Sequence, residues 1–264
     1  MPSMTTVCRE SSMLFHAADG SDLPMLVFEP GDGTQPRAGL VVFHGGALRE
    51  GSADGLAPHC RELASRGIFT VSAGYRLLGR GAIGIDDCIA DVRQALEQFK
   101  QIAASRGLET PQLALGGSSA GAHLALLAAM TTPDTPTAAP QTSVAAVVAL
   151  NPAGLDLRSL EPEQQRRLEH RAGIAAGRLT DYSLIEFVRP GNPPMLIHHG
   201  THDEVEPIDS VRRFRDAMAR SGNECTLLEY EHAEHGFHYP ANSGHFDNII
   251  DTTAQFLFDR TNPT

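Results

Sequence analysis

Short apolar segments alternate along the chain with longer amphipathic ones. Runs rich in Val, Ile, Leu and Phe predict strands, and apolar residues that recur every three or four positions predict helices. We expect strands over residues 13–16, 25–29, 40–44, 69–72, 112–116, 144–150, 195–198 and 226–230. We expect helices over residues 53–65, 85–104, 120–129, 208–221 and 246–258. This alternation predicts an α/β fold, a three-layer sandwich with helices on both faces of a mostly parallel sheet.

Two features qualify this regular pattern. A Gly20-Ser21 turn between the first two strands is typical of an antiparallel hairpin. Residues 153–190 separate two predicted strands by more than a usual crossover, and their middle, residues 161–171, is charged and helical in pattern. This insertion is either a solvated surface helix or a cap over a pocket. We therefore predict one α/β domain over residues 1–264 with an insertion at 153–190 for which both interpretations stay open.

The composition is that of a globular protein, with 41% hydrophobic and 20% charged residues. A formal net charge of −11 argues against nucleic acid or an anionic membrane as partner, because both require a basic surface. The N-terminus lacks a basic stretch followed by an apolar run, and the longest apolar runs, such as residues 144–150, are too short to span a bilayer. We therefore expect a cytoplasmic protein with reduced cysteines, and the sequence allows a homodimer.

The segment Gly117-Ser118-Ser119-Ala120-Gly121 matches the pattern G-x-S-x-G. In that pattern the serine occupies a strained turn between a strand and a helix, and the small residues around it let the two elements approach. A buried strand is predicted before this segment and a helix after it. The register selects Ser119 as a nucleophile, since a shift to Ser118 would place Ala120 where the second glycine belongs.

A second motif, His44-Gly45-Gly46-Ala47, follows the strand predicted at residues 40–44. Glycines allow the backbone to approach a substrate without a Cβ in the way. Such a loop supplies backbone N–H groups to an oxyanion hole. We expect one donor from Gly45, Gly46 or Ala47, and the other from Ala120, directly after the nucleophile.

An acid and a base follow two later strands. The chain order of serine, acid and histidine is the order found where the serine occupies a G-x-S-x-G turn. Asp203 comes after the strand at residues 195–198, and its carboxylate can orient an imidazole and stabilise its cation. Glu204 is its nearest rival. Among three histidines after the last strand, we select His235, which is followed by Gly-Phe, over His232 and His238.

The histidines also allow a metal-site interpretation, in which zinc would be held by His198, His199, His202 and Asp203 together with the later trio His232, His235 and His238. No helical His-Glu-x-x-His spacing supports this alternative, and it leaves the serine motif without a role. We therefore expect no metal and no organic cofactor.

Taken together, these motifs resemble the α/β-hydrolase superfamily. They are most similar to small bacterial carboxylesterases of the acetyl-xylan-esterase-like and hormone-sensitive-lipase-like groups. The resemblance implies an eight-stranded sheet and the triad roles for Ser119, Asp203 and His235. Many members have a third glycine and an aromatic residue where Ala47 and Leu48 stand.

The function implied is hydrolysis of a small carboxylic ester through an acyl-enzyme on a serine. The helix start at residues 119–123 is also similar to kynurenine formamidase. An amidase, a thioesterase or an acyl-transfer enzyme therefore remains as an alternative on the same triad. A non-catalytic module that binds a small molecule is the alternative from another class.

Overall fold

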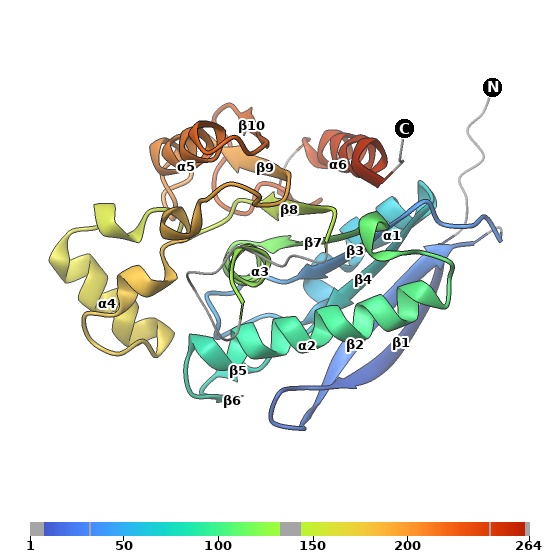
Figure 1. The fold of residues 1–264 in the computed structure, drawn as a ribbon, viewed down its shortest axis with the longest axis horizontal. Helices are drawn as coiled ribbons and strands as arrows, with labels where there is room; N and C mark the ends of the chain where they lie inside the picture. The colour runs from blue at the N-terminus through green and yellow to red at the C-terminus, as the bar shows by residue number, and fades with distance from the viewer. Residues whose placement is uncertain (1–7, 32, 133–143, 243, 262–264) are drawn as a thin grey trace.

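A central sheet organises the computed structural model, which describes residues 8–31, 33–132, 144–242 and 244–261 (Figure 1). Its strands are β1 (Cys8–His16), β2 (Asp22–Pro30), β3 (Ala38–Phe43), β4 (Ile68–Ala73), β7 (Leu113–Ser118), β8 (Ala146–Leu150), β9 (Met195–Gly200) and β10 (Cys225–Tyr230). The order across the sheet is β1-β2-β4-β3-β7-β8-β9-β10. β1 pairs antiparallel with β2, and β2 with β4, while all later pairings are parallel. The predicted eight-stranded, mostly parallel sheet and its early hairpin are confirmed.

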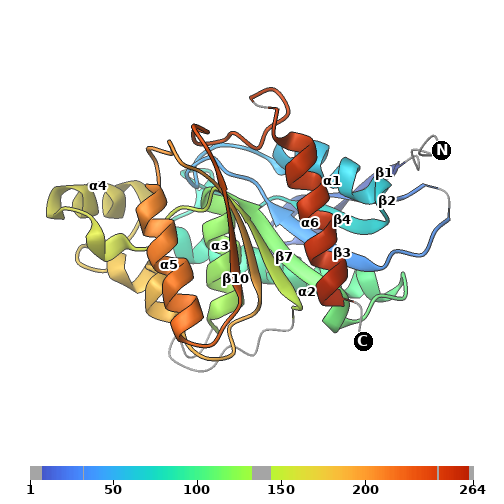
Figure 2. The same cartoon turned by 90° about the horizontal axis from the view of Figure 1, so that it is seen from above.

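Helices cover both faces of this sheet (Figures 1 and 2). On one face, α1 (Ala57–Ser65) packs beside α6 (Phe246–Thr261), and their residues Leu63 and Ile250 belong to one buried apolar cluster. On the other face lie α2 (Ile85–Ala104), α3 (Ala120–Met130) and α5 (Ile208–Arg220), with Phe99, Leu124 and Phe214 in a second cluster. Burial of two faces explains why the central strands are mostly apolar on both faces rather than alternating.

The parallel strands β3, β7, β8 and β9 bring their carboxyl ends to one edge of the sheet. All of their residues are buried. The predicted serine and acid motifs follow β7 and β9, and the histidine motif follows β10, which pairs parallel with β9. The topology therefore gathers motifs that are far apart in the sequence at a single edge, as is general for ligand sites of parallel α/β sheets.

The insertion between β8 and β9 contains the helix α4 (Pro162–Ala172) and three short 3-10 turns (Leu157–Ser159, Leu179–Tyr182 and Leu184–Phe187). α4 projects beyond the sheet on the side opposite the β1–β2 hairpin (Figures 1 and 2). Gln164 caps the helix by accepting a 2.9 Å hydrogen bond from the Glu161 N–H, and Gly173, at φ +64°, ends it. Its Leu168 and Ala172 line a pocket beside α3, which favours a cap over a purely solvated helix.

The structure differs from expectation in small elements. Residues 53–65 form a 3-10 turn (Ala53–Leu56) before α1, because Pro58 at the start of α1 favours a new helix beginning there. The two-residue strands β5 (Leu77–Leu78) and β6 (Gly81–Ala82) were not predicted, since they are too short to show a period. Residues 1–7, which begin the N-terminal segment that lacks a basic stretch followed by an apolar run, lie outside the described residues.

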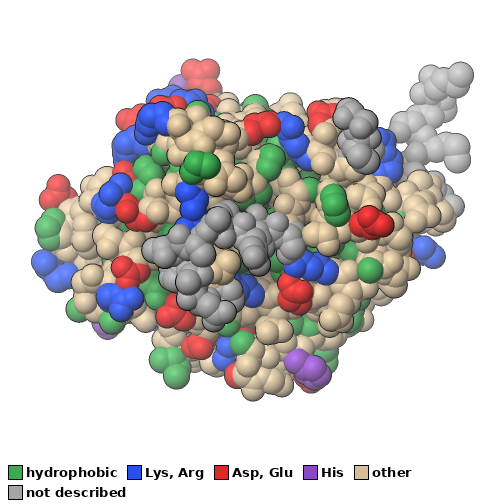
Figure 3. Space-filling view, viewed as in Figure 1, with side chains coloured by type: hydrophobic (Ala, Val, Ile, Leu, Met, Phe, Trp, Pro, Cys, Tyr) green, Lys and Arg blue, Asp and Glu red, His purple; other side chains and the backbone are tan. Residues whose placement is uncertain are grey.

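Charged side chains of both signs lie on the surface (Figure 3). Basic and acidic side chains are interspersed on the described part of the face that Figure 3 shows. Within the described ranges, no helix combines the length and the apolar character needed to cross a membrane. The thiols of Cys8, Cys60, Cys88 and Cys225 are free.

Candidate active site

Ser119 stands at a strained turn between β7 and α3. Its φ of +52° and ψ of −119° are conformations that residues other than glycine rarely adopt. The turn is held by hydrogen bonds from the Ser119 N–H to the Leu150 carbonyl (2.9 Å) and from the His123 N–H to the Ser119 carbonyl (3.0 Å). Such strain persists only where the surrounding structure fixes it, and it is concentrated at functional sites.

The two glycines of the serine motif are required by close packing. A Cβ on Gly117 would lie 2.6 Å from the carbonyl carbon of Gly121, and a Cβ on Gly121 would lie 2.2 Å from the carbonyl oxygen of Phe43. Both distances are far below any real Cβ contact. The motif therefore lets β3, β7 and α3 meet closely enough to fix the position of the serine.

Three side chains from three loops form one hydrogen-bonded chain. His235 Nε2 lies 2.9 Å from the Ser119 Oγ, and His235 Nδ1 lies 2.7 Å from Asp203 Oδ2. Because a carboxylate only accepts hydrogen bonds, Nδ1 carries a proton and donates it, which leaves Nε2 free to accept from the serine hydroxyl. This is the arrangement that a serine nucleophile and its general base need.

The Asp203 carboxylate is buried but well supplied with donors. Its Oδ1 accepts the backbone N–H groups of Val205 (2.8 Å) and Glu206 (3.0 Å). Burial by itself raises the pKa of Asp203, but the hydrogen bonds from His235 and from the Glu206 N–H outweigh it, so that the pKa lies below its usual value. The carboxylate is therefore ionised at neutral pH and accepts the hydrogen bond from His235 Nδ1.

The loop after β3 approaches the serine from the other side. A Cβ on Gly45 would lie 3.2 Å from the Ser119 Cβ. Gly46, at φ +117°, could carry no side chain, because a Cβ there would lie 2.1 Å from the Glu50 carbonyl oxygen. Ala47 follows at φ +52° and lines the same pocket as Ser119 and Ala120. Within the described residues, no backbone hydrogen bond from the N–H of Ala47 or Ala120 is formed.

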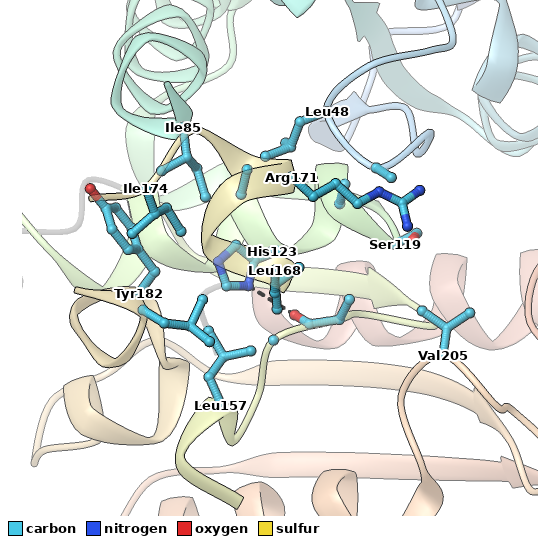
Figure 4. Close-up of a pocket in the computed structure, with 16 residues that line it drawn as sticks. Leu48, Ile85, Ser119, His123, Leu157, Leu168, Arg171, Ile174, Tyr182 and Val205 are labelled. Carbon is cyan, nitrogen blue, oxygen red and sulfur yellow. Dashed lines mark hydrogen bonds between the residues drawn. The ribbon is translucent and has the colours of Figure 1, made fainter. Parts of the chain in front are cut away.

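Ser119 opens into a pocket of about 170 Å³ between the sheet edge and the insertion (Figure 4). Most of its lining is apolar: Leu48, Ile85, Leu157, Leu168, Ala172, Ile174, Leu179 and Val205. His123 also lines it, but its Nδ1 donates to the Ala153 carbonyl (2.8 Å), and burial lowers its pKa to about 4. That imidazole is therefore neutral, and the only ionised side chain in the lining at neutral pH is Arg171.

The rival residues lie elsewhere. Glu204 is exposed and makes no hydrogen bond to His235, and His232 is exposed and contacts His202 at 3.2 Å between ring nitrogens. Ser118 points to the opposite side of the turn, into the core, where its Oγ lies 2.8 Å from His238 Nε2. The structure thus brings Ser119, Asp203 and His235 together and separates them from Glu204, His232 and His238.

Three neighbours of this site were not predicted. The Asn151 side-chain amide lies 3.4 Å from His235 Nε2, and His199 Nε2 lies 3.5 Å from Asp203 Oδ2. Arg171 reaches the pocket from the insertion (Figure 4). A sequence signal existed for Asn151, which directly follows a strand of the same sheet edge. His199 was considered only as a zinc ligand, and no signal marked Arg171.

The histidines of the metal interpretation are engaged in other contacts. His198 lies in the core, with Nδ1 2.8 Å from the Tyr230 hydroxyl and Nε2 3.1 Å from Thr253 Oγ1. His199 donates its Nε2–H to the Glu206 carbonyl at 2.8 Å. No group of three or more His, Cys, Asp or Glu side chains in the described part of the chain could hold a metal ion.

Similarity to known proteins agrees with this geometry. Residues 25–218 match the BD-FAE family model. The chain is 30% identical to esterase LipC of Mycobacterium tuberculosis over 77% of its own length and 54% of that protein, so it spans about half the length of this relative.

Solved structures are similar over nearly the whole chain. A thermophilic esterase from Thermogutta terrifontis with bound propionate has a TM-score of 0.80 and 29% identity, covering 98% of this chain and 96% of that one. The same organism's esterase 2 phosphorylated by paraoxon has a TM-score of 0.79 and 27% identity, covering 95% and 94% of the two chains. With its α/β-hydrolase sheet and a match over most of its length, this chain belongs to the BD-FAE family.

Proposed function

We propose that this protein is a serine esterase that hydrolyses short-chain carboxylic esters through an acyl-enzyme on Ser119. One observation carries the proposal: the hydrogen-bonded chain from Ser119 through His235 to Asp203 opens into an apolar pocket. The similarity to named esterases supports it. The cytoplasmic location and the homodimer remain predictions.

In the first half of the reaction, the Ser119 hydroxyl transfers its proton to His235 Nε2 while Oγ attacks the ester carbonyl carbon. The imidazolium that forms is stabilised by the Asp203 carboxylate, 2.7 Å from Nδ1. Collapse of the tetrahedral intermediate breaks the bond to the alcohol. His235 returns the proton to the departing alkoxide, so the alcohol leaves neutral and the acyl group stays on Ser119.

The oxyanion of that intermediate is assigned to backbone amides. The N–H of Ala120 lies at the start of α3, where the helix dipole favours negative charge, and the Gly45, Gly46 and Ala47 loop lies opposite. Preorganised donors of this type are worth on the order of 3 kcal/mol each. Water, deprotonated by His235, then attacks the acyl carbonyl carbon. Collapse of this second intermediate breaks the bond to Ser119 Oγ, which takes the proton back from His235, and the acid is released.

The pocket sets the acyl length. A cavity of about 150 Å³ holds a molecule the size of benzene, so a pocket of about 170 Å³ suits an acyl chain of at most about six carbons. A related structure contains propionate, which fits this range. Leu157, Leu168 and Leu179 would contact the chain, and the cap formed by residues 153–190 would exclude water from it.

A panel of p-nitrophenyl esters tests this function. We expect the highest kcat/KM for acetyl to hexanoyl esters and a decline of at least about tenfold for decanoyl and longer esters, because the longer chains exceed the pocket. The corresponding anilides should be cleaved far more slowly. Absence of ester turnover, or faster turnover of the anilides, would contradict the proposal.

A further inference from the structure

Arg171 introduces a positive charge into an otherwise apolar pocket. It belongs to the last turn of α4, and its side chain extends across the pocket toward Ser119 (Figure 4). None of the sixteen residues that line the pocket is acidic. Within the described residues, the Arg171 guanidinium forms no ion pair.

Two other arginines of the same helix form surface ion pairs and serve as a comparison. Arg166 and Arg167 face outward, and both pair with Glu163, at 2.6 and 3.0 Å. Arg171 differs from them in facing the pocket without a carboxylate. Arg171 is exposed to solvent and brings an unneutralised positive charge close to the candidate nucleophile.

A residue close to the candidate active site, Arg49, holds the backbone of Arg171 in place. Its carbonyl oxygen accepts two hydrogen bonds from the Arg49 guanidinium, at 3.0 Å from Nε and 2.7 Å from Nη2. Arg49 follows the Gly46–Ala47 turn that faces Ser119, and within the described residues it too has no carboxylate partner. The Arg49 guanidinium thus fixes the backbone that carries the Arg171 side chain.

We propose that Arg171 binds a carboxylate of the substrate, so that the preferred esters carry a negative charge close to the bond that is cleaved. A guanidinium offers parallel N–H donors that match a carboxylate, and the apolar lining strengthens the attraction. The proposal deepens and rests on the proposed esterase function. The charge can belong to the acyl part or to the alcohol part of the ester, and the two arms of the experiment distinguish these sources.

The experiment compares each anionic ester with its neutral carboxamide analogue. The acyl arm uses monoethyl succinate and ethyl succinamate; the alcohol arm uses 4-acetoxybenzoate and 4-acetoxybenzamide. The readout is the ratio of kcat/KM for the anionic ester to that for the amide analogue. We expect Arg171→Gln to lower this ratio at least tenfold in one arm, and Arg171→Lys to retain part of it. The arm affected identifies the side that carries the charge.

Arg167→Gln is the matched control, because it removes an equal charge from the outer face of the same helix and should leave the ratio unchanged. A ratio that moves less than twofold with Arg171→Gln in both arms, or that falls equally with Arg167→Gln, would overturn the proposal.

Calorimetry on the Ser119→Ala variant separates binding from turnover. Monoethyl succinate or 4-acetoxybenzoate should bind at least tenfold more weakly when Arg171→Gln is added. Equal binding of both variants to both anionic esters would refute the carboxylate site. The binding measurement does not depend on catalysis. If the proposed esterase function were wrong, the wild type would turn over none of the four esters, and that outcome is separate from the binding result.

Discussion

Two adjacent serines each contact a histidine of the same loop, yet the structure gives them different surroundings. Ser119 Oγ lies 2.9 Å from His235, and Ser118 Oγ lies 2.8 Å from His238. By hydrogen-bond length the two pairs are equivalent. They differ in the group that contacts the Nδ1 atom of the histidine and in the surroundings of the serine hydroxyl.

Behind His235 is the Asp203 carboxylate, whereas His238 Nδ1 faces the ring nitrogen of His59 at 3.1 Å. Burial and the neighbouring histidines lower the pKa of His238 well below its ordinary value, so this ring does not accept a proton at neutral pH. Ser118 is buried and is not among the residues that line the pocket into which Ser119 opens. A serine hydroxyl bonded to a histidine therefore suggests a nucleophile only when a carboxylate and space for substrate accompany it.

The largest expected effect distinguishes the two serines directly. Ser119→Ala should lower kcat for p-nitrophenyl acetate by at least about 10⁴-fold, because the members of a triad act as a unit. Ser118→Ala should retain activity within about tenfold, since it removes only a buried hydrogen bond. Steady-state kinetics on both variants measure this, and circular dichroism checks their folding. Reversed effects would move the nucleophile to Ser118.

A smaller effect on kcat is expected from replacing the group that contacts Nδ1 of each histidine. Asp203→Asn should reduce kcat by at least about 10², because the amide no longer holds the tautomer or stabilises the imidazolium. His59→Asn, the equivalent change behind His238, should reduce kcat by less than about fivefold. If His59→Asn were as damaging as Asp203→Asn, the buried pair would belong to the catalytic machinery.

The smallest expected effect concerns stability in acid. Burial lowers the pKa of His59 to about 4, below the unfolded value of about 6.5. Between these values the unfolded chain binds more protons, so this imidazole makes the free energy of unfolding decrease as pH falls from about 6.5 to 4. His59→Phe should remove up to about 1.4 kcal/mol per pH unit from that slope.

Urea denaturation at several pH values measures this slope. At pH 8 the imidazole is neutral in both states, so the difference between the variant and the wild type there reports packing alone. An unchanged slope below pH 6 would show that His59 takes up its proton without unfolding.

The sequence predicted the sheet and the three principal site residues because their signals are local. Buried parallel strands appear as continuous apolar runs, and Gly117 and Gly121 are required where β3, β7 and α3 meet. Asp203 and His235 directly follow strands whose ends share one edge. The structure brings these residues together, and their catalytic roles stay predictions.

What the sequence could not show depends on contacts between distant segments. His238 reaches Ser118 across 120 positions, and no local pattern reveals which of two adjacent serines faces the core. The direction of the Arg171 side chain depends on how the insertion folds back on the loop after β3. The oxyanion donors depend on backbone φ angles at Gly46 and Ala47, which composition alone does not fix.

Covalent labelling by paraoxon tests the central claim most directly, since a related esterase is phosphorylated by this compound. The wild type, Ser119→Ala and Ser118→Ala would each be treated with paraoxon, digested and analysed by peptide mass spectrometry. We predict one diethylphosphoryl group on Ser119 in the wild type and in Ser118→Ala, and none in Ser119→Ala. A phosphoryl group on Ser118, or labelling that persists in Ser119→Ala, would contradict the assignment of Ser119 as the nucleophile.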